Sequence, residues 1–503
     1  MPRSPHFVAL LLIAVATALR LAWAAALPVS TDEAYHWLYT VHPDVSYFDH
    51  PPMTMLVAKA GIALCGGWVH PFSLRLGFVL LCAATSWCLF RWTARFFGDA
   101  AGVWALLGFS VSHYLTAFGG PFALPDSPLF FFSLLTWWQA SEAVFSSNPG
   151  RNLGRWLIVG VGFGGAMLSK YHGVLVPGGV VLFALLTPSF RRLLWQPGPY
   201  LAAIVGFVLF SPVVWWNAMH DWASFKFQGG RIGGGGSPLI HGGPLVWLVG
   251  SLLFLTPWMW FWLSFELGRS LFRFRSLPAP QRLMVCLAVV PLGFFLATSF
   301  TTGKVLPHWP LLGYLPLLPL AAVRWAGLRL RRPLAVSWVL AELGILAVIL
   351  LQVNTGAIRV PAGVTDETRA YSGWQSVVEE LETRGIVAEP NVFLVTNQWD
   401  NSAQLSFALR NRVPVTCYHS FDARGFAFWS RPGEFVGRSG YLLVLDQPDG
   451  KHSFDEFGVF FERMTLFAEF PMTRSGVPLR PVRVYRCENQ LRPYPFDFTM
   501  RTK

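Results

Sequence analysis

Charge is scarce in this chain. Only 13% of its 503 residues are Asp, Glu, Lys or Arg, whereas 53% are hydrophobic, including 43 Phe and 23 Trp. A chain of this composition cannot fold in water without exposing large apolar surfaces, so it needs lipid as part of its solvent. The sequence therefore predicts a polytopic α-helical membrane protein.

Cysteine is also rare, and the six that are present show no paired spacing of the metal-site kind. Four of them lie in or near apolar runs, namely Cys65, Cys82, Cys88 and Cys286. A small buried thiol is the simplest interpretation there. The other two, Cys417 and Cys487, lie in the more polar C-terminal part, and the sequence leaves open whether they pair in a disulfide.

The net charge of +12 does not indicate binding to nucleic acid. The basic residues occur as short Arg clusters between apolar runs, which is how topology is set in a bilayer. We therefore expect membrane lipids, and no nucleic acid, among the partners.

Apolar runs long enough to cross a bilayer recur along the first 352 residues. A window of about 20 residues finds about eleven of them. They lie near residues 7–27, 72–90, 100–118, 128–145, 156–168, 173–188, 200–216, 245–265, 283–299, 309–325 and 334–352. The first run lacks a clear small-residue cleavage site and is followed by many more, so we interpret it as a retained span and not as a signal peptide.

Arginine marks the expected inner side of the membrane. If the N-terminus is cytoplasmic, every loop that falls inside carries arginine, in agreement with the positive-inside rule. These residues are Arg91, Arg95, Arg151, Arg155, Arg191, Arg192, Arg269, Arg273, Arg275, Arg282, Arg324, Arg329, Arg331 and Arg332. An odd number of spans then places everything after about residue 353 on the outer side.

The unusual polar residues fall on that same outer side. The predicted outer loops contain Asp32, Glu33, Asp49, His50, Asp126, Lys170, His172, residues 216–241, Lys304 and His308. Acids, lysines and histidines gathered on one face are expected when discontinuous segments assemble a single site there. The alternative, that a given Lys or His only anchors a helix end at the interface, stays open for each of them.

From about residue 360 the chain has ordinary charge density and alternates strand-like with helix-like patterns. Helical patterns occur in GWQSVVEELETRG and SAQLSFALRN, and strand patterns in NVFLVT, PVTCY, YLLVLD and VRVYRC. This alternation predicts a small α/β domain. We therefore divide the chain into a membrane domain, residues 1–355, and a C-terminal domain, residues 356–503, that caps the outer face.

Residues 31–53 crowd acids, histidines and aromatics directly after the first apolar run. The adjacent carboxylates of Asp32 and Glu33 repel each other and tend to differ in proton affinity, which leaves one of them ionised as a base. A competing interpretation is that Thr31 or Asp32 simply caps a helix that ends near Thr40. The sequence alone supports both interpretations.

Two further acids stand beside prolines. In YFDHPP, residues 47–52, the prolines restrict the backbone around Asp49 and His50. These two side chains are candidates to bind a divalent metal or a phosphate, although two ligands do not make a metal site. In PDSP, residues 125–128, Asp126 stands at the start of a span, where a helix cap is again the rival interpretation.

The motifs occur in a recognisable order. DEAYHW is followed by YFDHPPM, SLRL, PDSPLFFF, SKYHG and PHWPLLGY. Over roughly residues 7–325 this order resembles bacterial membrane glycosyltransferases of family 39, which belong to the GT-C superfamily and are related to protein O-mannosyltransferases and the lipid A aminoarabinose transferase. The resemblance implies a GT-C fold at the bacterial inner membrane. It also implies inverting transfer of a sugar from a polyprenyl-phosphate donor to a periplasmic acceptor: lipid A or another glycan, a lipid or a protein.

The resemblance also assigns roles to residues. The family's catalytic acid in the first loop falls on Asp32, with Glu33 beside it, and we expect Asp126 in the same catalytic group. YFDHPP is similar to an acid-basic-Pro-Pro element near metal and lipid phosphate, so Asp49 and His50 inherit those roles. The aminoarabinose transferases carry Lys where this chain has His50. A neutral imidazole binds phosphate less well than an ammonium, so either His50 is protonated or other cations do more of the work.

The leaving phosphate needs cations more than it needs a strong general acid. The candidates are His50, Lys170, Arg231, Lys304, Arg75 and Arg20. Arg20 lies within the outer half of an apolar span, where an unpaired guanidinium costs on the order of 3 kcal/mol. We expect it either to pair with a carboxylate or a phosphate or to extend to the interface.

Two other functions are compatible with a helical membrane protein of this size. A secondary transporter would also bury charges among about a dozen spans, but it often shows an internal repeat and interrupted helices near the bilayer midplane, which this sequence does not display. A non-catalytic lipid-binding or assembly protein of the same fold is the second alternative, because a fold does not fix function.

The arginine pattern predicts the orientation of the chain. A reporter fused after Arg192 should lie in the cytoplasm, and a reporter fused after Gln352 should lie in the periplasm. Paired alkaline phosphatase and green fluorescent protein fusions measure this. If both fusions report the same compartment, the outer loops do not share one face.

Overall fold

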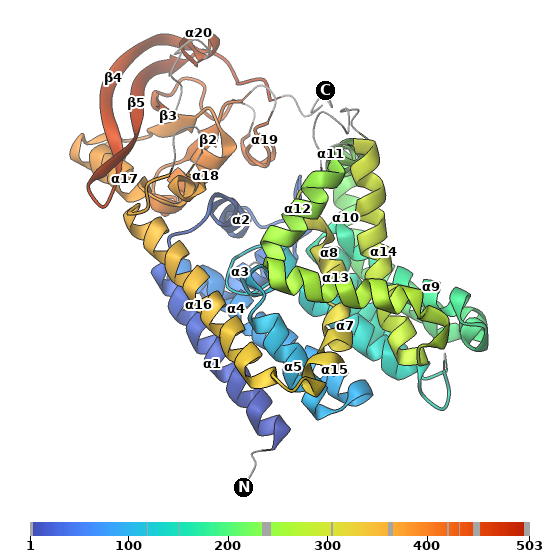
Figure 1. Cartoon of the computed structure of the whole chain (residues 1–503). Helices are drawn as coiled ribbons and strands as arrows, with labels where there is room; N and C mark the ends of the chain where they lie inside the picture. The colour runs from blue at the N-terminus through green and yellow to red at the C-terminus, as the bar shows by residue number, and fades with distance from the viewer. Residues whose placement is uncertain are drawn as a thin grey trace.

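A bundle of helices carries a smaller sheet domain at one end (Figure 1). The computed structural model describes residues 4–117, 119–149, 151–233, 243–302, 305–360, 366–419, 422–431, 433–445 and 453–496. Helices make up the chain as far as Thr355, and all the strands follow after it. This order agrees with the predicted helical membrane protein with a small C-terminal α/β part. The division between residues 355 and 356 stays a prediction.

The helices of the bundle vary widely in length. They are α1 (Pro5–Ala26), α2 (Thr31–Val41), α3 (Met53–Leu64), α4 (Pro71–Phe97), α5 (Asp99–Ser110), α6 (His113–Ala117), α7 (Asp126–Val144), α8 (Leu153–Ser169), η1 (Tyr171–Leu175), α9 (Gly178–Leu186), η2 (Pro188–Trp195), α10 (Pro197–Met219), α11 (Ala223–Gly233), α12 (Gly243–Leu255), α13 (Pro257–Phe272), η3 (Phe274–Ser276), α14 (Ala279–Thr302), η4 (Trp309–Tyr314), α15 (Leu317–Gly327) and α16 (Arg331–Thr355). The η elements are 3-10 helices.

Among the described residues, five helices are long and apolar enough to cross a membrane: α1, α4, α10, α14 and α16. Several others are apolar but shorter, including α3, α8 and α15. A helix rises 1.5 Å per residue, so the 12 residues of α3 fall well short of a hydrocarbon core about 30 Å thick. The structure therefore has several membrane-crossing helices, but not eleven of full length.

The expected span at residues 245–265 is not one continuous helix. Two helices occupy this stretch, α12 and α13, and their axes are bent by 116° at the break between them. Thr256 at the break has φ 71°, and Pro257 follows it. The ring of a proline disfavours helical backbone at the residue before it, so the sequence breaks the helix here despite its apolar composition.

The C-terminal part is built on a five-stranded mixed sheet of order β2-β1-β3-β5-β4. Its elements are η5 (Glu367–Tyr371), α17 (Trp374–Thr383), η6 (Ile386–Ala388), β1 (Phe393–Thr396), α18 (Trp399–Ala408), β2 (Val415–Cys417), α19 (Phe426–Trp429), β3 (Gly440–Leu445), α20 (Ser453–Gly458), β4 (Phe461–Arg474) and β5 (Val477–Gln490). β1 runs parallel to β2 and β3, whereas β5 is antiparallel to β3 and β4.

Both predicted helices and all four predicted strands of this part are present. The sequence analysis missed the edge strand β4, because two register shifts, near Leu466 and Met472, interrupt its alternation of buried and exposed residues. Cys417 lies on β2 and Cys487 on β5, with β1 and β3 between them, and both thiols are free.

The C-terminal part rests on α2. Residues from both parts form one apolar cluster around Tyr35 and Trp37, with Ala403 and Phe426 contributed from the sheet domain. The ring of Trp37 lies edge-on to Phe407 of α18, with centroids 5.3 Å apart. The docking covers the loop between α2 and α3 and thereby encloses Asp49.

A buried ion pair fixes the start of α2. The Arg75 Nε and Nη2 atoms each donate to the Glu33 carboxylate at 2.7 Å, and both side chains are almost fully buried. The same guanidinium donates to the carbonyls of Ala24, Leu27 and Pro28, at the end of α1 and in the turn after it.

Glu33 has two further partners. It accepts a hydrogen bond from the backbone N–H of Ala123 at 3.0 Å, and it completes a capping box with Ser30. Neither Glu33 nor Arg75 has hydrogen-bonding capacity left for a substrate. The catalytic role expected for Glu33 and the phosphate-binding role expected for Arg75 are therefore replaced by a shared positioning role.

Breaking this pair should destabilise the protein strongly. Arg75→Met leaves the Glu33 carboxylate buried without its cation, which typically costs about 3–5 kcal/mol. The matched control is Arg95→Met on the same helix, because the Arg95–Glu142 bridge is solvent-exposed on the Arg side and should contribute about 0–1 kcal/mol. Thermal unfolding of both variants in detergent tests the comparison, and equal losses would contradict the assigned role.

Candidate active site

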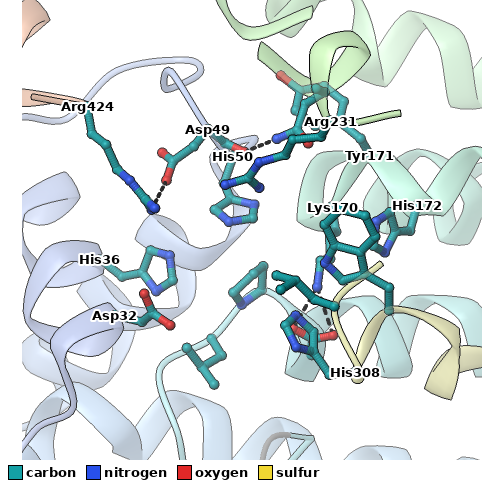
Figure 2. Close-up of a pocket in the computed structure, with 16 residues that line it drawn as sticks. Asp32, His36, Asp49, His50, Lys170, Tyr171, His172, Arg231, His308 and Arg424 are labelled. Atoms are coloured by element: carbon teal, nitrogen blue, oxygen red, sulfur yellow. Dashed lines mark hydrogen bonds and ion pairs between the residues drawn. The ribbon is translucent and has the colours of Figure 1, made fainter. Parts of the chain in front are cut away.

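A cavity of about 220 Å³ lies where the helical bundle meets the C-terminal part (Figure 2). Its lining comes from widely separated segments of the chain and consists of Asp32, His36, Asp49, His50, Leu124, Pro125, Asp126, Lys170, Tyr171, His172, Gln228, Arg231, Leu306, His308, Trp309 and Arg424. Charged, histidine and apolar side chains therefore share one enclosed space, as the sequence predicted for the acids and histidines.

Asp32 enters the cavity from the first turn of α2. Ser30 caps this helix by accepting from the backbone N–H of Glu33, so neither Thr31 nor Asp32 is the cap. The spacing of four residues places His36 next to Asp32 on the same helix face (Figure 2). The Nδ1 atom of His36 lies 2.9 Å from the carbonyl oxygen of Ala123. Within the described part of the chain the Asp32 carboxylate forms no ion pair.

Asp49 is held by three side chains. The hydroxyls of Tyr35 and Tyr39 donate to its Oδ1 atom, and Arg424 lies 3.4 Å from its Oδ2 atom. The side chain of Gln228 donates to its backbone carbonyl at 2.7 Å. This set of partners is suited to a carboxylate that stays ionised and fixed in place.

Burial would raise the pKa of the Asp49 carboxyl, but the neighbouring His50 and Arg424 and the hydrogen bond from Tyr39 outweigh this effect and leave the pKa below its ordinary value. Burial lowers the pKa of His50 to about 3, and the nearby Lys170 and Arg231 act in the same direction. At neutral pH His50 is therefore an uncharged imidazole, and any cation for a phosphate has to come from another residue.

Asp126 and Lys170 form a second buried pair. Asp126 is the first residue of α7 and Lys170 directly follows α8, and the ammonium nitrogen lies 2.9 and 3.0 Å from the two carboxylate oxygens. The Tyr114 hydroxyl also donates to Asp126 at 3.3 Å. Asp126 makes no side-chain cap on α7. Its rival interpretation as a helix cap is therefore not supported.

Arg231 approaches from α11. Its guanidinium carbon lies 4.1 Å from the centroid of the Phe227 ring one turn earlier in the helix, which is a cation–π contact. No carboxylate within the described ranges forms an ion pair with it. Figure 2 shows Arg231 near His50, across the cavity from Asp32.

Arg424 was missed by the sequence analysis. It lies between β2 and α19, and its guanidinium stacks on Trp399 at 3.7 Å from the ring centroid while it contacts Asp49. The next residue, Gly425, donates its backbone N–H to the Tyr35 hydroxyl at 3.0 Å. No motif marks this arginine in the sequence, because only the docking of the C-terminal part brings it to the cavity. His36, Tyr171 and Gln228 of the helical bundle also line the cavity and were not singled out, although the spacing of His36 one helical turn after Asp32 could have indicated it.

Three of the expected site residues that the structure describes do not line this cavity. Glu33 and Arg75 bind each other behind α2. Arg20 lines a separate cavity between α1 and α16. Lys304 lies outside the described residues. The structure does bring together Asp32, Asp49, His50, Asp126, Lys170 and Arg231.

Asp49 and His50 do not fit a divalent metal. The carboxylate of Asp49 is already used by two hydroxyl donors and a guanidinium, and a positively charged Arg424 stands where a metal would approach. In the described ranges no three acids, histidines or cysteines cluster with a geometry that would hold a metal ion.

An apolar cavity of about 330 Å³ adjoins the first one. Tyr171, His172, Gln228, Arg231 and Trp309 line both of them. The remaining lining of the apolar cavity is almost entirely aromatic or aliphatic and comprises Met167, Val174, Leu175, Phe207, Phe210, Phe225, Phe294 and Phe295. A charged chamber thus adjoins an apolar one, with Arg231 at the boundary.

The sequence and fold resemble known membrane glycosyltransferases. Residues 49–216 match the model of the dolichyl-phosphate-mannose-protein mannosyltransferase family. Lipid A galacturonosyltransferase RgtD from Rhizobium johnstonii is 31% identical over 195 residues, which cover 38% of this chain and 38% of that protein. The match to this curated relative thus spans about two fifths of its length.

Solved structures extend the likeness to nearly the whole chain. ArnT from Cupriavidus metallidurans bound to undecaprenyl phosphate aligns with a TM-score of 0.64 at 15% identity, over 95% of this chain and 97% of that one. Its apo state gives 0.63 at 16% identity over the same shares. The chain thus has an ArnT-like fold, and its similarity to the mannosyltransferase family confirms the resemblance that its ordered motifs indicate.

Proposed function

We propose that this protein transfers a sugar, with inversion, from a polyprenyl-phosphate donor to a hydroxyl of a lipid, glycan or protein acceptor at the periplasmic face of the bacterial inner membrane. The observation that carries the proposal is the charge pattern of the cavity. Two carboxylates are neutralised by Arg424 and Lys170, which leaves Asp32 and Arg231 without an ion-pair partner among the described residues.

This pattern matches what the reaction needs. A glycosyl transfer requires one base to take the acceptor proton and at least one cation to stabilise the leaving phosphate. A single unpaired carboxylate on one side of the cavity and a single unpaired guanidinium on the other supply these two functions. A planar guanidinium can also bind two phosphate oxygens at once.

The adjoining apolar cavity supports a lipid-linked donor. A polyprenyl chain is a long hydrocarbon, and the phenylalanines of α10, α11 and α14 offer it an apolar lining that ends at Arg231. Undecaprenyl phosphate is the ligand in the ArnT structure that shares this fold, which supports the same donor class here. The name of the galacturonosyltransferase relative supports lipid A as one of the acceptors to test.

In the proposed reaction, Asp32 accepts the proton of the acceptor hydroxyl as its oxygen forms a bond to the anomeric carbon of the sugar. The bond between that carbon and the phosphate oxygen breaks from the opposite face, and polyprenyl phosphate leaves with the bonding electrons. Arg231 stabilises the developing phosphate charge. The Asp126–Lys170 and Asp49–Arg424 pairs hold the walls of the cavity and place two further cations near the leaving group.

Asp32 is the residue that tests the enzyme hypothesis. Asp32→Asn keeps the size of the side chain but removes the basic oxygen, so turnover should fall by about two orders of magnitude or more. Mass spectrometry of envelope lipids and glycans from cells with and without the gene identifies the product, and the variant is then scored by its level.

Asp44→Asn is the matched control for this change. Asp44 lies in the same acidic stretch but outside the cavity lining, so product should stay near the normal level. Normal product from Asp32→Asn would instead favour a lipid-binding protein or a transporter.

Arg231 tests how the donor is held. Arg231→Ala removes the unpaired cation at the boundary of the two cavities, and polyprenyl phosphate should bind more weakly by about 1.5–3 kcal/mol, the range for hydrogen bonds to charged groups. Titration of the purified protein with undecaprenyl phosphate measures this. Lys226→Ala, on the same helix but outside both linings, is the control and should bind normally. Equal affinity in both variants would place the phosphate elsewhere.

A further inference from the structure

A third cavity, of about 160 Å³, lies between α1, α5 and α16. Its lining is aliphatic apart from Trp23, Ser110 and two charged residues, Arg20 and Glu342. Figure 1 shows α1 and α16 side by side along one edge of the bundle. Both are membrane-crossing helices, and Val15, Leu19 and Leu343 of the lining are about half exposed. The cavity is therefore a lateral groove that opens toward the acyl chains of the bilayer.

The two charged residues of this groove are buried and incompletely paired. Arg20 is only 4% exposed, and its Nε and Nη2 atoms have no hydrogen-bond partner among the described residues. Glu342 is 3% exposed. One of its oxygens lies 3.3 Å from Nδ1 of His113, while its Oε2 atom has no partner in the same part of the chain. Unsatisfied charged atoms at this depth are expensive, so the groove is suited to a ligand that bonds to both.

We propose that this groove binds an acyl chain that carries a hydroxyl group near its ester, and that such a hydroxyacylated lipid is the acceptor. An ester carbonyl accepts from the guanidinium of Arg20, and a hydroxyl donates to Oε2 of Glu342. The aliphatic lining takes the hydrocarbon on either side. A free anion would leave Glu342 unsatisfied, and so would an acyl ester without the hydroxyl group, which could bond only to Arg20. Only the identification of the bound lipid as the acceptor rests on the proposed function. The binding site itself does not depend on it.

The position of the groove suits an acceptor. Trp23 in its lining packs against Phe122, with ring centroids 5.7 Å apart, and both belong to an apolar cluster with Leu124. Leu124 also lines the catalytic cavity. One apolar cluster thus joins the lining of the groove to the lining of the catalytic cavity. The proposed donor groove lies on the other side of the bundle, at α10, α11 and α14, so two lipids approach the site from opposite edges (Figure 1).

The short helix α6 connects the groove with the Asp126–Lys170 pair of the catalytic cavity. His113 at the start of α6 lies against Glu342, and the next residue, Tyr114, donates to Asp126 in the catalytic cavity. A ligand that repositions Glu342 therefore acts on a segment that contacts Asp126. Binding of an acceptor in the groove is therefore coupled to the active site through α6.

Photocrosslinking tests the site without any need for turnover. A benzophenone amino acid at position 343, which lines the groove, is compared with one at position 340, which is exposed on the same helix but outside the lining. The protein is placed in nanodiscs with equal amounts of a phospholipid bearing 3-hydroxytetradecanoyl chains and its tetradecanoyl counterpart. Adducts are counted by mass spectrometry.

The hydroxylated lipid should be preferred about tenfold at position 343, as expected for one hydrogen bond to a charged group, and not at position 340. The double variant Arg20→Met/Glu342→Met, which leaves no lone buried charge, should fold and lose the preference. Equal adducts of both lipids at position 343, or a preference unchanged in the double variant, would overturn the site.

The outcome is separable from that of the proposed function. Asp32→Asn should keep the lipid preference at position 343 although it loses product. If instead Asp32→Asn makes normal product while the preference is present, the catalytic proposal falls and the lipid site stands. If Asp32→Asn is inactive and the preference is absent, the enzyme stands and its acceptor does not enter through this groove.

Discussion

The site depends on one buried ion pair that contributes no chemistry. Arg75 of α4 ties the end of α1 and the turn after it to Glu33, and Glu33 in turn holds the backbone at Ala123. The start of α2 is therefore fixed against three other segments. Asp32, the neighbour of Glu33, points into the cavity because of this constraint. Of the two adjacent carboxylates, Glu33 holds the segments together and Asp32 stays free for its proposed role as the base.

Most charged side chains of the cavity are also paired. A low-dielectric chamber cannot hold many unpaired ions, so Asp49 and Asp126 each have a basic partner. The neutral His50 fits this pattern, because a third cation beside Arg231 and Lys170 would be costly in the empty protein. Here Arg424, supplied by the C-terminal part, stands beside Asp49.

Sequence patterns predicted what depends on short-range order. The long apolar helices, the C-terminal strands other than β4 and the gathering of acids and histidines follow from hydropathy, alternation and ordered motifs. The break at Thr256 was missed although Pro257 signals it, because the apolar run continued through it. The partners of individual charges could not be predicted, since Glu33–Arg75 and Asp49–Arg424 join residues 42 and 375 positions apart. Only tertiary packing decides such pairs.

Arg424 has a consequence for how the protein is made. Synthesis proceeds from the N-terminus, so all other residues that line the cavity exist before position 424 is translated, and Arg424 directly follows the sheet strand β2 in the C-terminal part. In a chain that has inserted its helices but has not folded its C-terminal part, the cavity is open and Asp49 lacks its cationic partner Arg424. We expect such a chain to bind ligands poorly, because the chamber is completed only as the last part of the chain folds.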